Sequence, residues 1–210
     1  MRRYLTEFVG TLFFVMTIGL AVAVNNPLTP LIIGFTLMVV VYMGAHVSGG
    51  HYNPAVTLAL FLRSKMSRGD LLPYWAAQIL GALTGAFLAS MFLDHTFTIA
   101  PPPTTNSGTA LMVEIFYTTL LALVVLNCAA REATKGNSYF GLAIGFTIVI
   151  AAFAGGPISG GAFNPAVAVG SIVIDTVVGS GSLGHLWIYL VGPLAGGVIA
   201  SAIFQMQGEA

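Results

Sequence analysis

Charged side chains are scarce in this sequence of 210 residues: 7% are Asp, Glu, Lys or Arg, whereas 57% are hydrophobic. Roughly a quarter of the residues in soluble domains carry charge, which argues against a water-soluble globular protein. Seven basic residues balance seven acidic ones. Without a basic surplus the chain lacks the electrostatic footprint of a nucleic-acid partner.

Cysteine and catalytic clusters are also lacking. The single cysteine, Cys128, has no partner in the chain for a disulfide and no metal-ligand spacing around it. No nucleophile, base and orienting partner can be identified together. The sequence therefore predicts a protein that is not an enzyme, with no catalytic residue, no metal site and no cofactor.

Long apolar runs are abundant instead, and six of them come near the roughly 20 residues that cross a bilayer as a helix. The runs are continuous, whereas membrane β-barrel strands alternate in polarity. The first run is too long for a secretory signal and lacks a convincing cleavage site. We expect six membrane-spanning helices at residues 4–24, 31–47, 71–93, 111–130, 139–154 and 184–205.

Two shorter apolar segments, 53–62 and 166–174, follow stretches that are too rich in glycine and proline for regular helix. Ten helical residues extend about 15 Å, which is half the thickness of the hydrocarbon core. These segments are therefore predicted to be half-helices. The backbone is predicted to be irregular over residues 48–54 and 155–165. Its non-helical parts, such as residues 49–52 and 160–163, must be buried in protein or line a wet cavity, because unpaired amides cannot face lipid.

An internal repeat is the strongest signal in the chain. Three fragments recur with one offset of 111 residues: Ile-Gly-Phe-Thr at 33 and 144, Ser-Gly-Gly at 48 and 159, and Asn-Pro-Ala-Val at 53 and 164. Residues 1–107 and 108–210 are therefore predicted to be two repeats of three spans and a half-helix each. Three spans is an odd number, so the second repeat is inverted, which places a site between the copies near the bilayer midplane.

Each Asn-Pro-Ala motif, Asn53-Pro54-Ala55 and Asn164-Pro165-Ala166, has the chemistry of a helix start. Asparagine is a preferred N-cap, and proline at the first helical position loses no hydrogen bond. Inversion aims the two positive helix ends at each other, which repels cations. The two side-chain amides can donate to the oxygen of a small neutral molecule, and in a file of water this interrupts proton hopping.

The basic residues set an expected orientation. Threading six spans places all seven on one side of the membrane, which the positive-inside rule makes cytoplasmic. Both termini are then cytoplasmic, and the short termini favour a multi-pass protein of the cell membrane. The seven residues are Arg2, Arg3, Arg63, Lys65, Arg68, Arg131 and Lys135.

The sequence resembles the aquaporin, or major intrinsic protein, family over its whole length. The resemblance rests on the paired Asn-Pro-Ala motifs, on a glutamate in the first span of each half (Glu7 and Glu114), and on Gly-Gly-His-Tyr-Asn-Pro-Ala-Val-Thr at 49–57. It implies an all-α membrane protein with six transmembrane helices plus two half-helices in an inverted repeat. It also implies one pore per chain, a homotetramer, and a channel for water and small neutral solutes.

The resemblance assigns residues to the expected pore. Loop carbonyls that line it would be those of Gly49, Gly50, His51, Gly160, Gly161 and Ala162, and the narrow external filter would consist of Ile33, Ala152, Gly161 and Val167. Water-selective members have an aromatic residue or histidine at the first filter position and arginine at the last. Ile33 and Val167 predict a wider, more apolar filter, permissive to glycerol, urea, ammonia or hydrogen peroxide. Val167 is similar to the valine of some plant vacuolar-type members, whereas Ala168 replaces the aspartate usual in glycerol facilitators.

The intramembrane glutamates and the inverted repeat also fit other functions. Intramembrane glutamates such as Glu7 and Glu114 can handle ions or protons, but here they are expected to brace the broken segments by accepting their amides. Secondary transporters also use inverted repeats and half-helices. A structural membrane protein with a vestigial pore would share the same sequence features.

Overall fold

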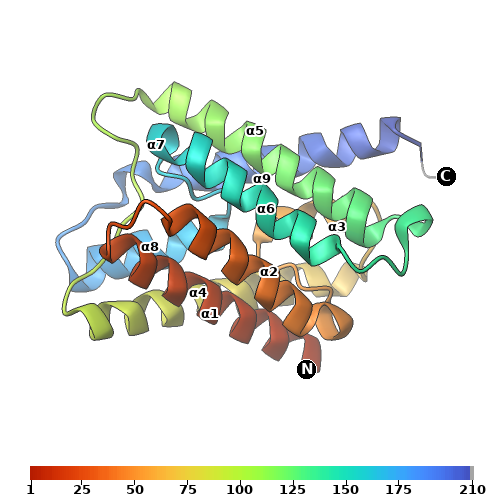
Figure 1. The fold of residues 1–210 in the computed structure, drawn as a ribbon, viewed down its shortest axis with the longest axis horizontal. Coiled ribbons are helices and arrows are strands. Elements are labelled where there is room, and N and C mark those ends of the chain that lie inside the picture. Colours follow the sequence, from red (N-terminus) through yellow and green to blue (C-terminus); the bar gives the residue numbers. More distant parts are fainter. Residues whose placement is uncertain (209–210) are drawn as a thin grey trace.

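The protein is an all-helical bundle in the computed structural model, which describes residues 1–208. Six long or moderately long helices surround two shorter ones that start inside the bundle (Figure 1). The helices are α1 (Arg2–Ala23), α2 (Thr29–Ser48), α3 (Pro54–Leu62), α4 (Leu71–Leu93), α5 (Ser107–Val125), α6 (Phe140–Ala154), α7 (Gly156–Ser159), α8 (Pro165–Val178) and α9 (Leu186–Met206). Helical turns at Arg68–Asp70, Leu126–Ala130, Glu132–Thr134 and Leu183–His185 extend or link them.

The expected fold class is confirmed, with differences in length. Five helical segments are long and apolar enough to cross a membrane, whereas α6, the expected fifth span, has 15 residues. The irregular stretch expected over residues 155–165 is shorter than predicted, because α7 forms a helical turn within it. The second half-helix, α8, runs on to Val178 rather than ending at residue 174. Proline at 157 stands at the start of α7, where its missing amide costs no bond.

Long helices from the two halves pack in matching pairs at glycines. An ideal Cβ added to Gly81 of α4 would lie 2.3 Å from the carbonyl oxygen of Phe8 in α1, and one added to Gly196 of α9 would lie 2.7 Å from that of Ile115 in α5. Only glycine permits such close backbone approach. The pairs α1–α4 and α5–α9 are therefore equivalent halves of one bundle.

The two halves meet where α2 crosses α6. A Cβ on Gly34 would lie 2.6 Å from the carbonyl oxygen of Gly145, and a Cβ on Gly145 would lie 2.6 Å from that of Gly34. The crossing is thus related by the same twofold symmetry as the sequence repeat. Figure 1 shows α3 and α8 entering the bundle from its opposite ends.

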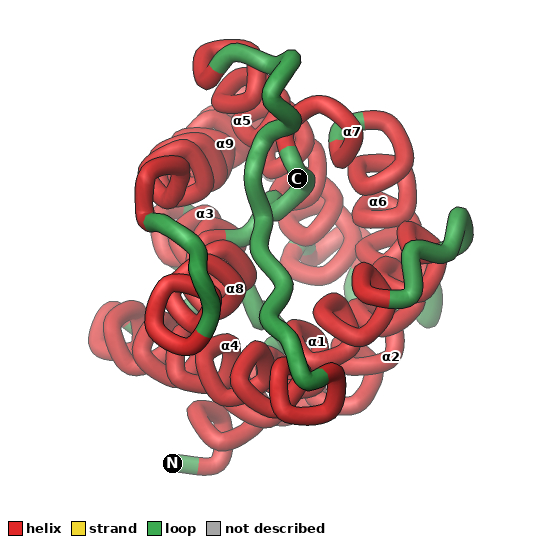
Figure 2. Tube along the Cα trace, turned by 90° about the vertical axis from the view of Figure 1, so that its left-hand side faces the viewer, coloured by secondary structure: helices red, strands yellow, loops and turns green. Residues whose placement is uncertain are grey.

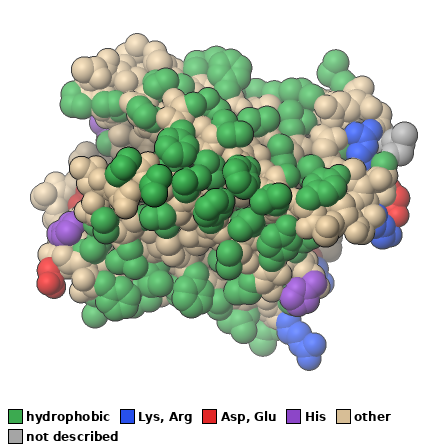
Figure 3. Space-filling model, viewed as in Figure 1, with side chains coloured by type: hydrophobic (Ala, Val, Ile, Leu, Met, Phe, Trp, Pro, Cys, Tyr) green, Lys and Arg blue, Asp and Glu red, His purple; other side chains and the backbone are tan. Residues whose placement is uncertain are grey.

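The two ends of the bundle differ in charge. Both ends of the described chain lie at the right-hand end in Figure 1, where the Lys and Arg side chains visible in Figure 3 also lie. There Arg63 Nη1 donates to Gln205 Oε1 at 3.1 Å, and Arg131 donates to the carbonyl oxygen of Gly208. We call this the basic end. The connection of residues 94–106 crosses the opposite end (Figure 2).

The flank of the bundle is apolar. Large hydrophobic side chains cover much of the face drawn in Figure 3. The exposed large hydrophobic residues of the chain include Leu80, Phe116, Ile150 and Val191, each more than half exposed. An apolar flank between polar ends matches the hydrocarbon core between two aqueous phases. The chain is a multi-pass membrane protein.

Candidate functional site

The two half-helices are capped by the asparagines of the two motifs. Oδ1 of Asn53 accepts from the Ala55 amide, and Oδ1 of Asn164 accepts from the Ala166 amide, each at 2.9 Å. Both asparagines have the extended backbone of an N-cap, with proline at the next position. The capping inferred from the sequence is therefore how α3 and α8 begin.

The same two side chains join the halves crosswise. Nδ2 of Asn53 donates to the carbonyl oxygen of Phe163, and Nδ2 of Asn164 donates to that of Tyr52, both at 2.9 Å. Each side-chain amide has two N–H groups, so one remains on each for a further acceptor. The starts of the two half-helices thus lie together at the centre of the bundle, with a donor pair between them.

The backbone of each broken segment repeats residue for residue. Gly49 and Gly50 have φ of 92° and 63°, and Gly160 and Gly161 have φ of 91° and 74°, values that favour glycine. Tyr52 and Phe163 also have positive φ, at 48° and 50°. A left-handed conformation at bulky residues is costly and persists only where surrounding contacts enforce it.

Those contacts come from the two glutamates. Oε1 of Glu7 accepts from Ser48 Oγ and the His51 amide, and its Oε2 accepts from the Tyr52 amide and Gln78 Nε2, all within 3.0 Å. The side chains of both glutamates, Glu7 and Glu114, are fully buried. These are the contacts that a bracing role requires.

Glu114 makes the equivalent contacts in the second half. It accepts from Ser159 Oγ at 2.7 Å and from the amides of Ala162 and Phe163 at 3.1 and 2.6 Å. Glu114 therefore has one partner fewer than Glu7. The residue that corresponds to Gln78 is Pro193 of α9, which has no side-chain donor. The two are 115 residues apart, the offset that also relates Tyr74 to Tyr189.

Several residues of the site were not singled out by the sequence. The hydroxyl groups of Tyr74 and Tyr189 donate to the carbonyl oxygens of Ser48 and Ser159, so these tyrosines are buried supports of the broken segments. Gln78 was not recognised either. Its correspondence with Pro193, 115 residues later, could have marked it as a difference between the halves.

A narrow cavity passes along the starts of the half-helices. Its free volume of about 30 Å³ holds about two water molecules. Four helices contribute apolar side chains one turn apart, and the broken segments contribute Gly50, His51, Gly161 and Ala162. The apolar lining consists of Phe14 and Ile18 of α1, Ile33 and Leu37 of α2, Val56 of α3, Leu121 and Val125 of α5, and Ile144, Ile148 and Ala152 of α6.

The residues expected in the pore are distributed as follows. Three of the four expected filter residues, Ile33, Ala152 and Gly161, line this cavity together. Val167 is buried, with 1% of its surface exposed, and lies outside the lining described within residues 1–208. Gly160 packs against the carbonyl oxygen of Ala100, where an added Cβ would come within 2.6 Å.

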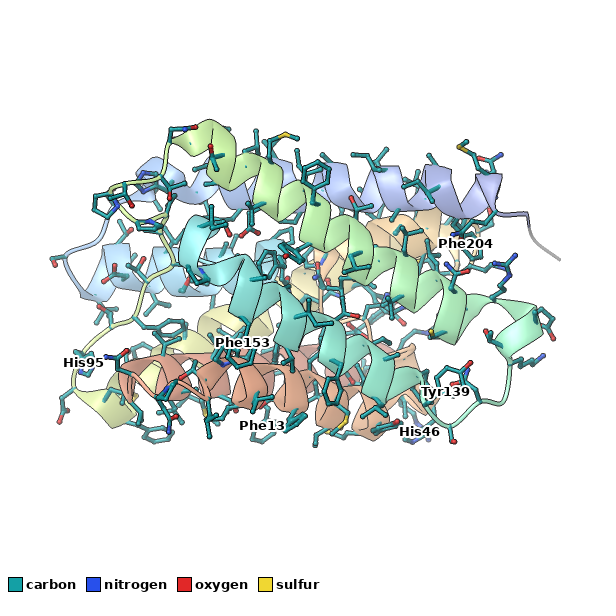
Figure 4. All side chains as sticks on the ribbon, turned by 45° about the horizontal axis from the view of Figure 1, so that its top comes forward. Phe13, His46, His95, Tyr139, Phe153 and Phe204 are labelled. Carbon is teal, nitrogen blue, oxygen red and sulfur yellow. The ribbon has the colours of Figure 1, made fainter. Side chains whose placement is uncertain are left out.

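A wider vestibule of about 470 Å³ opens at the basic end. Gly49, His46, Phe140 and the segment 128–137 line it. Figure 4 shows His46 and Tyr139 at this end, with His95 at the other. Gly49 therefore belongs to the vestibule, while Gly50, the next residue, belongs to the narrow cavity.

A bundle of membrane-crossing helices around a narrow cavity, capped from both ends by half-helices, defines a membrane channel. The sequence profile of the Major intrinsic protein family matches residues 1–204. The chain belongs to this family.

Individual relatives agree. The chain is 33% identical to "Glycerol uptake facilitator protein-like 6" of Lactiplantibacillus plantarum, with 100% of this chain and 99% of that protein covered. It is 36% identical to "Probable aquaporin TIP2-2" of Oryza sativa subsp. japonica, covering 98% and 86%. The solved aquaglyceroporin of Plasmodium falciparum has the same fold, with a TM-score of 0.86 at 22% identity over 97% of this chain and 94% of that one.

Proposed function

We propose that this protein is a passive channel for water and small uncharged solutes, among them glycerol, urea, ammonia and hydrogen peroxide, that excludes ions and protons. The observation that carries the proposal is the crosswise pair of Asn53 and Asn164, which cap two opposed half-helices and line a cavity of about 30 Å³. Family members named for water and for glycerol uptake support both substrate types.

Ions and protons are excluded at the centre. The two positive helix ends raise the energy of a cation there. The free N–H group of each asparagine donates to the oxygen of a passing water, so that water cannot donate along the file in both directions. Around the pair, the apolar side chains of Phe14 and Leu121 offer no replacement for the hydration shell of an ion.

A passive mechanism is favoured over coupled transport. The two intramembrane glutamates hold four and three hydrogen bonds from the broken segments and their supports. Binding of Na⁺ or H⁺ at either carboxylate would have to break these contacts and release buried amides. A structural protein with a vestigial pore is disfavoured by the open cavity that both motif asparagines line.

The membrane context is part of the proposal. By the positive-inside rule the basic end faces the cytoplasm, with both termini there, in a cell membrane. The exposed apolar flank contacts the lipid bilayer and three further copies of the chain in a homotetramer. The cavity that we assign as the pore lies within each chain.

Stopped-flow light scattering of proteoliposomes tests the proposal. We expect permeability to water and to urea well above that of protein-free vesicles, because no residue in the expected filter carries a bulky charged side chain. Val167 itself lies outside the lining, but the longer side chain of Val167→Arg would extend from it toward the external side of the cavity and should lower the urea-to-water permeability ratio about tenfold. Val177→Arg, on the same helix with a 75% exposed side chain, is the matched control and should leave the ratio unchanged. Water flux with every larger solute refused by the unmodified protein would contradict the wide filter.

A further inference from the structure

The repeat gives each expected filter residue a counterpart at the basic end. Subtracting or adding the offset of 111 relates Ile33 to Ile144, Gly161 to Gly50 and Val167 to Val56, and all three pairs are identical. The fourth residue, Ala152, corresponds to Val41. Val167 and Val41 lie outside the lining of the cavity, so the pairs Ile33–Ile144 and Gly161–Gly50 are the ones in which both identical residues line it, at two levels.

Two of the identical pairs differ in how tightly they are enclosed, whereas Val167 and Val56 are both buried, with 1% and 2% of their surface exposed. At the opposite end Ile33, Ala152 and Gly161 are all partly exposed. At the basic end Ile144 is 4% exposed, Val56 is 2% exposed and Gly50 is buried. Ile144, Gly50 and Val56 all line the cavity. Ile144 and Gly50 are thus more enclosed than the identical residues Ile33 and Gly161, which leaves less free space beside them at the basic end.

The basic end also has a polar side chain that the other end lacks. His51 lines the cavity, and its counterpart at the opposite end is Ala162. Nδ1 of His51 lies 3.2 Å from Thr57 Oγ1, which fixes the ring, whereas the residue that corresponds to Thr57 is Ala168. The lining thus contains three polar side chains, namely Asn53, Asn164 and His51.

The other ring nitrogen of His51 lies where the cavity meets the vestibule. An ideal Cβ on Gly49, which lines the vestibule, would be 2.8 Å from His51 Nε2. Within residues 1–208 this Nε2 has no hydrogen-bond partner. It is therefore available to a permeating molecule that leaves the vestibule of about 470 Å³ for the cavity of about 30 Å³.

The geometry points to the basic end, at Ile144, Gly50, Val56 and His51, as the constriction that selects solutes in this channel, in place of the external filter. We call these four residues the neck. This inference rests on the proposed function, and it assigns the solute selectivity of the channel to the neck. A neutral solute passes the neck when it fits between Ile144 and Val56 and can exchange a hydrogen bond with His51 Nε2, which replaces one that it makes to water.

Truncating the same side chain at each level tests this assignment. Ile144→Ala and Ile33→Ala are compared in proteoliposomes for the ratio of urea to water permeability. We expect Ile144→Ala to raise this ratio at least about threefold more than Ile33→Ala does, since a few methylene groups in an apolar passage change discrimination by an order of magnitude. Ile150 lies on the exposed side of the same helix as Ile144, with 53% of its surface exposed. Ile150→Ala is therefore the control for the effects of mutation and reconstitution, and it should not change the ratio.

The outcomes separate the neck from the proposed function. A larger effect of Ile33→Ala, equal effects, or no effect of either variant overturns the neck while the channel function stands. Absence of water and urea flux in the unmodified protein overturns the channel function and the neck with it. If Ile144→Ala does not fold, Ile144→Val makes the same comparison with Ile33→Val. His51→Gln retains a hydrogen-bonding group and should keep the urea-to-water ratio within about twofold, whereas His51→Ala should change it more.

Discussion

Two buried carboxylates hold the broken segments in shape, and they do so unequally. Glu7 accepts from two amides, a serine hydroxyl and Gln78, whereas Glu114 accepts from two amides and a serine hydroxyl. The strained φ of Tyr52 and Phe163 coincides with the amides that these carboxylates bind. At the level of single residues, the conformation of the site therefore depends on acceptors far away in the sequence.

Replacing these acceptors should unfold the protein before it changes selectivity. Glu7→Ala removes the acceptor of four buried donors, of which Ser48 Oγ and Gln78 Nε2 also have other acceptors. The two amides are left without one, and at about 1–3 kcal/mol each the loss is at least about 2 kcal/mol. Glu114→Ala should cost less, since Glu114 accepts from one donor fewer. Thermal unfolding in detergent measures both, with Glu132→Ala, whose side chain is exposed, as a neutral control. A Glu7→Ala protein that folds normally but shows altered ion coupling would support a proton or ion relay instead.

At the scale of elements, the helix pairs depend on glycines that admit a neighbouring backbone. Gly81 and Gly85 of α4 face the carbonyl oxygens of Phe8 and Leu12, and Gly196 of α9 faces that of Ile115. Backbone atoms cannot move aside as the end of a flexible side chain does. The spacing of α1 from α4, and of α5 from α9, is therefore set by these positions.

A methyl group at such a position should separate the pair. Gly81→Ala places Cβ 2.3 Å from the Phe8 carbonyl oxygen, and overpacking of this kind costs about 1–3 kcal/mol. The melting temperature in detergent should fall. Gly69→Ala is the control, because nothing lies within 4 Å of a Cβ there. An unchanged melting temperature for Gly81→Ala would show that the pairing does not depend on this contact.

Most elements could be predicted from local sequence, and their irregular ends could not. The apolar run at 71–93 has the bounds of α4, and the Asn-Pro pairs fix the starts of α3 and α8. The helical turn α7 was missed, because glycines around Pro157 suggest a continuous break. The turn forms because Ser159 bonds both Glu114 and the Gly161 amide, and Glu114 lies on another helix. The cause of this helical turn is therefore a tertiary contact and not the local sequence.

At the scale of the whole molecule, the inverted repeat explains both the prediction and its limits. One offset of 111 residues was enough to infer two opposed half-helices, and the fold agrees. The crosswise bonds from Asn53 to Phe163 and from Asn164 to Tyr52 could not be inferred, because they join the two copies and depend on their exact docking. The burial of Val167 likewise follows from the packing around α8. Its distance from the Asn-Pro-Ala motif in the sequence does not reveal that packing.

Symmetry is also broken where the chemistry of the two halves differs. Gln78, Thr57 and His51 in the first half correspond to Pro193, Ala168 and Ala162 in the second. Gln78 Nε2 joins Glu7 to Thr57 Oγ1 at 2.8 and 2.9 Å, and Thr57 in turn contacts His51. The first half thus has a polar network that reaches the cavity lining at His51, where the second half has apolar residues.

Solute flux under imposed ion gradients is the measurement that tests the central claim, a passive pore between two opposed half-helices, most directly. Proteoliposomes are loaded with no urea and given external labelled urea, with or without an inward Na⁺ or H⁺ gradient. The account predicts that urea enters until its internal and external concentrations are equal, at a rate that the gradients do not change. Accumulation of urea above the external concentration, driven by either ion, would contradict it.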